Sequence, residues 1–152
     1  MDYFIDIATN APIVCAVLGW LIAQLLKIVV TAVVEKTVDF GKFMAPGGMP
    51  SSHSAFVTAL AATVGWQEGV GSVYFALAAA FALIVMYDAC GVRRAVGEQA
   101  KVINLLIDFL KEHDPQTDQE TIRVILGHTP FQVVMGFILG LVIAFVYKMI
   151  MQ

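Results

Sequence analysis

Charged residues are scarce in this chain. Asp, Glu, Lys and Arg make up 14% of its 152 residues and hydrophobic residues 59%, and the mean hydropathy is +0.81. Soluble domains carry about 25% charged residues, so this composition excludes an ordinary soluble domain and favours the lipid bilayer. The length fits a single domain.

Other features are missing as well. The net charge is only −3 and no basic patch is interleaved with aromatic residues, which argues against a nucleic-acid partner. The first ten residues contain two aspartates and no Lys or Arg. They therefore do not resemble the start of a signal peptide, and we expect the first apolar segment to be retained. The two cysteines, Cys15 and Cys90, are predicted near opposite membrane faces, too far apart to bridge.

Long apolar runs are present and predict four membrane-spanning helices, at about residues 11–34, 51–66, 73–89 and 131–151. A spanning helix needs about 20 apolar residues, and the second of these runs is short. Alanines in the third run, and Gly136 with Gly140 in the fourth, allow close helix packing in lipid. The predicted fold is an all-α integral membrane bundle forming one domain over residues 1–152.

A polar insert, residues 95–127, separates the third and fourth runs. In its first half, charged and apolar residues alternate at helical spacing, which predicts an amphipathic helix. That helix is expected to lie in the membrane interface or to cover a site. Asp114-Pro115 predicts the start of a second helix, with a capping box at Thr117 and Glu120 and an end at Gly127.

The distribution of cations predicts the topology. Four spans place the 35–49 loop and the insert on one side of the membrane, which the positive-inside rule makes cytoplasmic, with both termini outside. Lys148 belongs to the other side. The cations on or toward the cytoplasmic side are Lys27, Lys36, Lys42, Arg93, Arg94, Lys101, Lys111 and Arg123.

The stretch Gly47–Ser54 reads Gly-Gly-Met-Pro-Ser-Ser-His-Ser. Gly48 permits a tight turn, and Ser51 and Ser52 are suitable helix N-caps. The helix start offers unpaired N–H groups to an anion, and His53 can hold or release a proton near neutral pH. The stretch fits an anion site containing an acid, or equally a capped membrane helix with a stray polar histidine.

The first apolar run contains Gln24, Lys27 and Thr31 at spacings that place them on one helical face. A lysine within a span is costly unless it faces the bundle interior, a cavity or a nearby interface. Lys27 therefore either faces inward with Gln24 or snorkels to the membrane surface.

Five chemically active residues are predicted to reach the same membrane face. His53 opens the second span, Asp88, Arg93 and Arg94 close the third, and His128 opens the fourth. Arginines orient phosphate oxygens bidentately, and one histidine can attack phosphorus while another protonates the leaving alkoxide. Positive-inside anchoring would explain the two arginines equally well if they stood alone.

These residues carry a resemblance to a known family. Pro50-Ser51-Ser52-His53 resembles the Pro-Ser-Gly-His motif of the type 2 phosphatidic-acid phosphatase and vanadium haloperoxidase superfamily, with Ser52 in the glycine place. His128–Val133 resembles its His-x-x-x-Asp helix. The strings GGMPSSHSA, DACGVRR, GEQA and LGHTP are similar to those of a divergent branch of small bacterial and plastid membrane proteins.

The resemblance implies roles for individual residues. His128 would be the nucleophile that forms a phosphohistidine, and His53 the general acid. Lys27 would be the counterpart of the lysine in the first motif of the superfamily. The residues expected to contact the substrate phosphate are Lys27, Gly48, Ser51, Ser52, Arg93 and Arg94. The residues expected to support them are Gln24, Asp88, Glu98 and Gln132.

The chain departs from the family pattern in three places, one of which is that the first motif lacks its Arg-Pro partner. A 33-residue insert lies between Arg94 and His128, where the superfamily usually has five residues. Gln132 stands in place of the carboxylate that orients and charges the nucleophile, and an amide cannot stabilise an imidazolium as a charge would. Either Asp88 or Glu98 substitutes for that carboxylate, or the protein is slow, or it binds without turnover.

The predicted function is hydrolysis of a lipid phosphate, phosphomonoester or diphosphate, without a metal. The alternative is a non-catalytic lipid-phosphate binder or transporter that retains the anion site. Mg²⁺ held by Asp88 and Glu98 is disfavoured because two carboxylates are too few, so no cofactor is expected. The resemblance implies a bacterial cytoplasmic membrane, and the distribution of cations predicts that the site faces the cytoplasm. Four spans are few for the superfamily, which makes a homodimer a reasonable expectation.

Overall fold

The computed structural model describes residues 2–36, 48–113, 120–122, 124 and 127–151. These residues form helices and turns with no strand, which confirms the all-α prediction. The predicted loop cations Lys42 and Arg123, and Thr117 of the predicted capping box, lie outside them. The helices are α1 (Asp2–Thr9), α2 (Ala11–Glu35), α3 (Ser52–Glu68), α4 (Val73–Cys90), α5 (Val92–His113) and α6 (Pro130–Met151).

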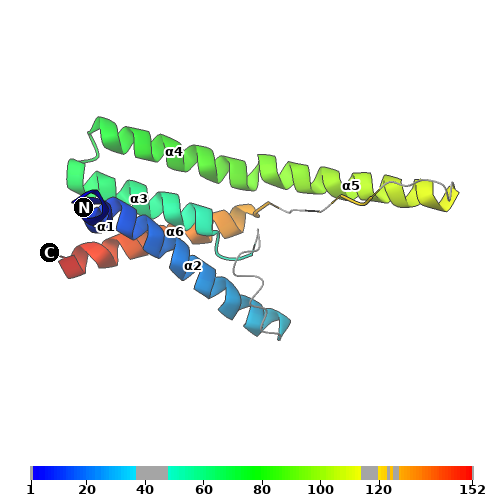
Figure 1. Ribbon diagram of the computed structural model, residues 1–152, viewed down its shortest axis with the longest axis horizontal. Helices are drawn as coiled ribbons and strands as arrows, with labels where there is room; N and C mark the ends of the chain where they lie inside the picture. The colour runs from blue at the N-terminus through cyan, green and yellow to red at the C-terminus, as the bar shows by residue number, and fades with distance from the viewer. Residues whose placement is uncertain (1, 37–47, 114–119, 123, 125–126, 152) are drawn as a thin grey trace.

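Helix α3 is the centre of the bundle, with α2, α4 and α6 packed against it (Figure 1). Its buried positions are mostly small, and glycines on its neighbours let backbones touch. A Cβ added at Gly19 of α2 would lie 2.9 Å from the carbonyl oxygen of Ala55, and one at Gly140 of α6 would lie 2.7 Å from the same atom. Both neighbours therefore approach α3 at the distance that only glycine permits.

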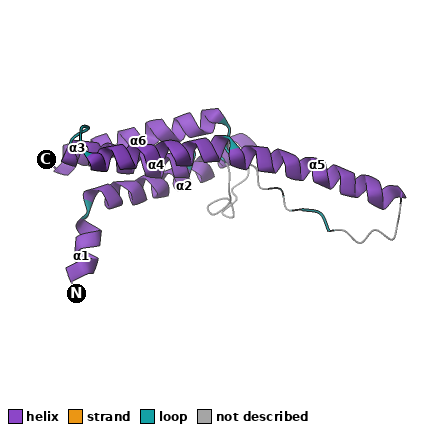
Figure 2. Cartoon of the chain, turned by 90° about the horizontal axis from the view of Figure 1, so that it is seen from above, coloured by secondary structure: helices purple, strands orange, loops and turns teal. Residues whose placement is uncertain are grey.

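Polar caps fix where the helices begin. The Ser51 side chain accepts a hydrogen bond from the Ser54 N–H at 3.3 Å and caps α3. Asn10 does the same for α2, accepting from the Ile13 N–H at 3.2 Å. The short helix α1, which precedes Asn10, is absent from the sequence-based prediction; Figure 2 shows it leaving the bundle at an angle to α2.

Helices α4 and α5 are almost continuous, interrupted only at Gly91 (Figure 1). The Gly91 N–H still donates to the Tyr87 carbonyl at 2.8 Å, so the chain resumes helical geometry immediately. The predicted helix in the first half of the insert is confirmed as α5, which projects beyond the bundle (Figure 2). Arg93 and Arg94 therefore lie in the first turn of α5, not at the end of the third span as predicted.

The prediction of a second helix in the insert is wrong where the chain is described, because Glu120, Thr121, Ile122, Val124 and Gly127 are not helical. Asn104 of α5 supplies the physical reason. Its side-chain amide donates to the Ile122 carbonyl at 2.7 Å and accepts from the Ile122 N–H at 2.7 Å. Both backbone groups that a helix would use are thus satisfied by a side chain.

Within the part of the chain that the structure describes, three helical stretches are long and apolar enough to cross a membrane: 11–34, the α4–α5 stretch 73–113, and 130–151. Helix α3, predicted as a fourth span, does not meet that length: its 17 residues rise about 26 Å against a hydrocarbon core of about 30 Å. Because other helices cover α3, it needs no lipid-facing apolar surface, which explains its small and polar residues.

Candidate functional site

Two histidine rings face each other where α3 and α6 begin. Their ring centroids are 6.2 Å apart and the planes are inclined at 64°. His53, in the first turn of α3, is exposed, whereas His128 is only 4% exposed and precedes α6 by two residues. The structure therefore brings together the two predicted site histidines, which are 75 residues apart in the sequence.

Backbone contacts fix the position of His128. Its N–H donates to the carbonyl of Ala89, near the end of α4, at 2.9 Å. The preceding residue, Gly127, lies against the backbone of α5: a Cβ there would collide with the amide nitrogen of Arg94 and come within 2.7 Å of the Arg93 carbonyl carbon. Only glycine allows this approach, which holds the histidine against the α4–α5 junction.

The starts of α3 and α6 are joined in the same way. The Ser51 N–H donates to the Gln132 carbonyl at 3.1 Å. Gly136 of α6 packs against the Ser51 carbonyl, and a Cβ there would lie 2.9 Å from the Ser54 Cβ. The distance between the two histidines is thus set by main-chain contacts.

Gln132 holds His128 and caps α6 at the same time. Its Oε1 accepts the Thr129 N–H at 3.0 Å, while the Gln132 N–H donates to the Thr129 hydroxyl at 3.3 Å, which is a capping box. The same Oε1 lies 3.3 Å from the Nδ1 of His128. An amide oxygen only accepts, so this contact requires the proton on Nδ1, and in the neutral ring Nε2 then carries the lone pair.

The surroundings of His128 keep it neutral. Burial lowers its pKa below the ordinary 6.5, because a charged imidazolium is poorly solvated there. The hydrogen bonds to the side chain of Gln132 and to the backbone of Gly48 oppose this shift, whereas the charges of Lys27 and His53 add to it. A neutral ring with an unprotonated Nε2 has the form that a nucleophile requires.

The lysine in the first span faces the bundle interior. Lys27 is 4% exposed and Gln24, one turn away on α2, is 5% exposed, so the alternative of a snorkelling lysine is wrong. The Lys27 ammonium donates to the Ser52 hydroxyl at 3.4 Å. Gly48, at a φ of 82°, lies beside the aliphatic stem of the lysine. The first span therefore delivers a buried cation to the histidine pair.

Arg93 forms an ion pair across the α4–α5 junction. Its Nε lies 2.6 Å from the Oδ2 of Asp88, and both side chains are partly exposed. Both charges lie within electrostatic range of His53, as does Lys27. Arg94 is also exposed in this turn. A phosphate beside His53 would meet cations from two directions.

Two of the predicted site residues have other roles. Glu98 pairs with Lys101 at 3.2 Å on the exposed surface of α5 and does not join the histidines. Ser51 is fully buried, and its hydroxyl is occupied by the Ser54 N–H and hydroxyl, so it serves as a cap. Since Asp88 pairs with Arg93, neither Asp88 nor Glu98 takes the carboxylate place beside His128, and each faces a different cation.

Thr129 and the Ala89 carbonyl position His128, and neither contact was predicted from the sequence. A signal for Thr129 was present, because Thr129-Pro130-Phe131-Gln132 matches the Thr-x-x-Gln pattern of a capping box with proline in the first turn. The backbone contact of Ala89 leaves no mark in the sequence.

Known proteins resemble this chain over most of its length. The family model described as the Divergent PAP2 family matches residues 8–143. The uncharacterized membrane protein YuiD of Bacillus subtilis (strain 168) is 38% identical over 151 residues, which cover 93% of this chain and 96% of that protein. No solved structure matches the chain. The resemblance to a divergent phosphatase-related branch is confirmed, while the link to haloperoxidases stays a prediction. This helical membrane protein belongs to the Divergent PAP2 family.

Proposed function

We propose that this protein hydrolyses the terminal phosphate of a membrane lipid through a phosphohistidine on His128. The observation that carries the proposal is the pair of facing histidines, one buried and hydrogen-bonded through Nδ1, the other exposed. Two rings in different environments suit two different tasks, attack on phosphorus and proton transfer.

In the first step the Nε2 lone pair of His128 attacks phosphorus and the bond from phosphorus to the lipid oxygen breaks. The leaving alkoxide takes a proton from His53. The Lys27 ammonium and the Arg93 guanidinium stabilise the charge on the phosphoryl oxygens, which is usually the largest contribution to such a reaction.

In the second step water attacks the phosphohistidine. Neutral His53 accepts a proton from the water, the N–P bond breaks, and inorganic phosphate leaves with His128 restored. Throughout, Gln132 keeps the Nδ1 proton in place, so that only Nε2 faces the substrate. No step in this sequence requires a metal or cofactor.

A lipid is the substrate class that this location favours. The histidines lie at one end of α2, α3 and α6. Two of these helices, α2 and α6, are long enough to span a membrane. A phosphate attached to an acyl or prenyl chain reaches that depth with its chain between helices. We place the site on the cytoplasmic face of a bacterial cytoplasmic membrane, in a protein that forms a homodimer.

The test is phosphate release by purified protein in detergent, from phosphatidic acid, phosphatidylglycerophosphate and prenyl phosphates. Release that persists in EDTA and disappears in H128A and H53A is the expected result. H113A is the matched control, since His113 stacks on Phe109 at the surface of α5 and should leave the rate unchanged. Equal release by wild type and H128A would overturn the proposal.

A second candidate is a lipid-phosphate binder or transporter without turnover. One observation favours it: among the described residues, no carboxylate contacts His128 to stabilise the imidazolium formed during attack. If this candidate is right, H128A still binds or transports the lipid phosphate, whereas the double variant R93Q/R94Q no longer binds it. Binding without hydrolysis of any lipid would favour it over the phosphatase.

A further inference from the structure

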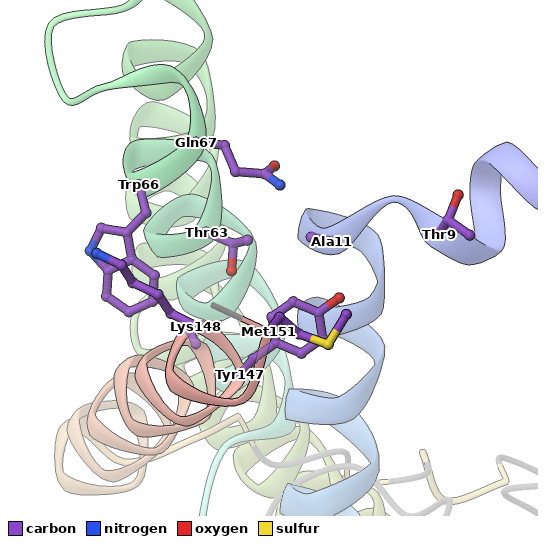
Figure 3. A pocket seen from close by; sticks show the side chains of 9 residues that line it. Thr9, Ala11, Thr63, Trp66, Gln67, Tyr147, Lys148 and Met151 are labelled. Carbon is purple, nitrogen blue, oxygen red and sulfur yellow. The ribbon is translucent and has the colours of Figure 1, made fainter.

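A cavity lies at the opposite end of the bundle from the histidines. It has a volume of about 320 Å³ and opens between the start of α2 and the ends of α3 and α6 (Figure 3). Because the histidines lie at the end of α2 and the starts of α3 and α6, the length of these helices separates the two sites. Residues that line it include Thr63, Trp66, Gln67, Tyr147, Lys148 and Met151.

Lys148 is the cation of this cavity. Its Nζ lies 5.3 Å from the centroid of the Trp66 ring, which itself packs edge-to-face against Phe145 at 6.4 Å. This cation–π contact holds the ammonium in place without neutralising it. Among the described residues, Lys148 pairs with no carboxylate. The cavity thus presents a positioned positive charge that no described carboxylate offsets.

Uncharged polar groups and apolar groups complete the lining. The amide of Gln67 extends from α3 toward Ala11, and Tyr147 and Met151 lie between α6 and α2 (Figure 3). Amide and hydroxyl groups donate hydrogen bonds to phosphodiester oxygens, and the apolar part suits glycerol and the first acyl carbons. Trp and Tyr beside a Lys near a helix end are typical of the membrane interface, where lipid headgroups lie.

We propose that this cavity binds the headgroup of an anionic glycerophospholipid, in the leaflet opposite to the histidine site. The anionic class follows from the free charge of Lys148, because a zwitterionic headgroup brings its own cation. The aromatic and apolar lining favours a lipid over free inorganic phosphate, which would gain nothing from it. The inference is independent of the phosphatase proposal, since the two sites share no residue.

Quenching of Trp66 fluorescence tests the proposal. The W20F protein, in which Trp66 is the remaining tryptophan, is placed in nanodiscs of phosphatidylcholine with increasing fractions of acyl-brominated phosphatidylglycerol. A binding site gives quenching that saturates at a low fraction of the brominated lipid, whereas non-selective contact gives quenching proportional to that fraction. K148Q should weaken the apparent affinity about tenfold, as expected for loss of one bond to a charged group.

K101Q is the matched control, because Lys101 lies on α5 and pairs with Glu98; it should leave the saturation unchanged. Proportional quenching, or equal saturation in wild type and K148Q, would overturn the proposal. Reversal of the quenching by inorganic phosphate would assign the cavity to free phosphate and overturn the lipid. If W20F does not fold, native mass spectrometry of retained phosphatidylglycerol in wild type and K148Q decides the same question.

Discussion

Helices α3 and α5 show two opposite ways of using a helix in the same chain. In α3, nine of 17 residues are buried and glycines of α2 and α6 touch its backbone. In α5, three of 22 are buried, and apolar side chains such as Leu105 and Leu106 are more than half exposed. The site depends on both, because α3 carries His53 and the first turn of α5 carries Arg93. A precise site therefore requires only the first turn of α5 to be fixed against the bundle.

The largest expected effect comes from filling the space beside α3. In G140L the added side chain has to displace the Ala55 carbonyl and the Thr58 Cβ, both under 3 Å from a Cβ at this position. Overpacking of this kind costs about 1–3 kcal/mol or more, so we expect a clear fall in the melting temperature in detergent. G71A is the control, since nothing lies within 4 Å of a Cβ there. Equal melting of G140L and wild type would show that α3 is not tightly packed.

The next effect concerns His128 and pH. Its pKa lies below 6.5, so the neutral nucleophile persists as pH falls through 6.5, and kcat/KM should decline only at more acidic pH. The unfolded chain binds this proton more readily, so the free energy of unfolding also decreases as pH falls below about 6.5.

Q132E sharpens this prediction, because glutamate keeps the capping box and adds the missing charge. The charge raises the pKa of His128, so the acidic limb of the kcat/KM profile should move to higher pH. It also stabilises the imidazolium formed during attack, for which we expect at least about a tenfold gain in kcat, well within the roughly 10⁴-fold that a buried carboxylate supplies in a serine protease triad. If the acidic limb of the kcat/KM profile did not shift in Q132E, the residue at position 132 would not contact the group whose titration sets that limb.

A smaller effect is expected in α5. N104A removes both hydrogen bonds to Ile122 and should destabilise only the contact between α5 and Ile122, by about 1 kcal/mol for each exposed bond. Hydrogen exchange should become faster at Ile122 and stay unchanged at His53 and His128. Faster exchange at His128 would show that α5 and the site are more tightly coupled than their packing indicates.

The smallest effect is expected for L106S, since Leu106 is 58% exposed on the apolar face of α5. The melting temperature of the protein in detergent should match that of wild type within experimental error. V57S is the contrasting variant, because Val57 of α3 is buried in a cluster with Ala61 and with Ala82 of α4. It should melt at a clearly lower temperature. A large fall in the melting temperature of L106S would reveal a partner on the apolar face of α5.

The sequence predicted the parts of the fold that depend on apolar runs. The ends of α2, α4 and α6 lie within about two residues of the prediction, because long apolar segments and caps such as Asn10 are local signals. It also predicted that Lys27, His53 and His128 reach one face, since an antiparallel order of helices requires it.

The sequence could not predict features that arise from contacts between distant residues. Ile122 is not helical because Asn104, 18 residues away, takes its backbone bonds. Glu98 was placed in the site by its chemistry, yet Lys101 one turn away holds it at the surface. Helix α1 is too short and too near the chain start to stand out by periodicity.

The contact of Gly127 with the backbone of Arg93 and Arg94 has a consequence for how this family can vary. The 33-residue insert between Arg94 and His128 therefore begins and ends at the same point of the bundle. An excursion whose two ends touch can lengthen or shorten without moving either end, and each doubling of a flexible loop costs only about 0.6 kcal/mol of closure entropy. The insert is therefore a replaceable module, and relatives with inserts of different length should keep a glycine before this histidine and the same spacing between the two rings.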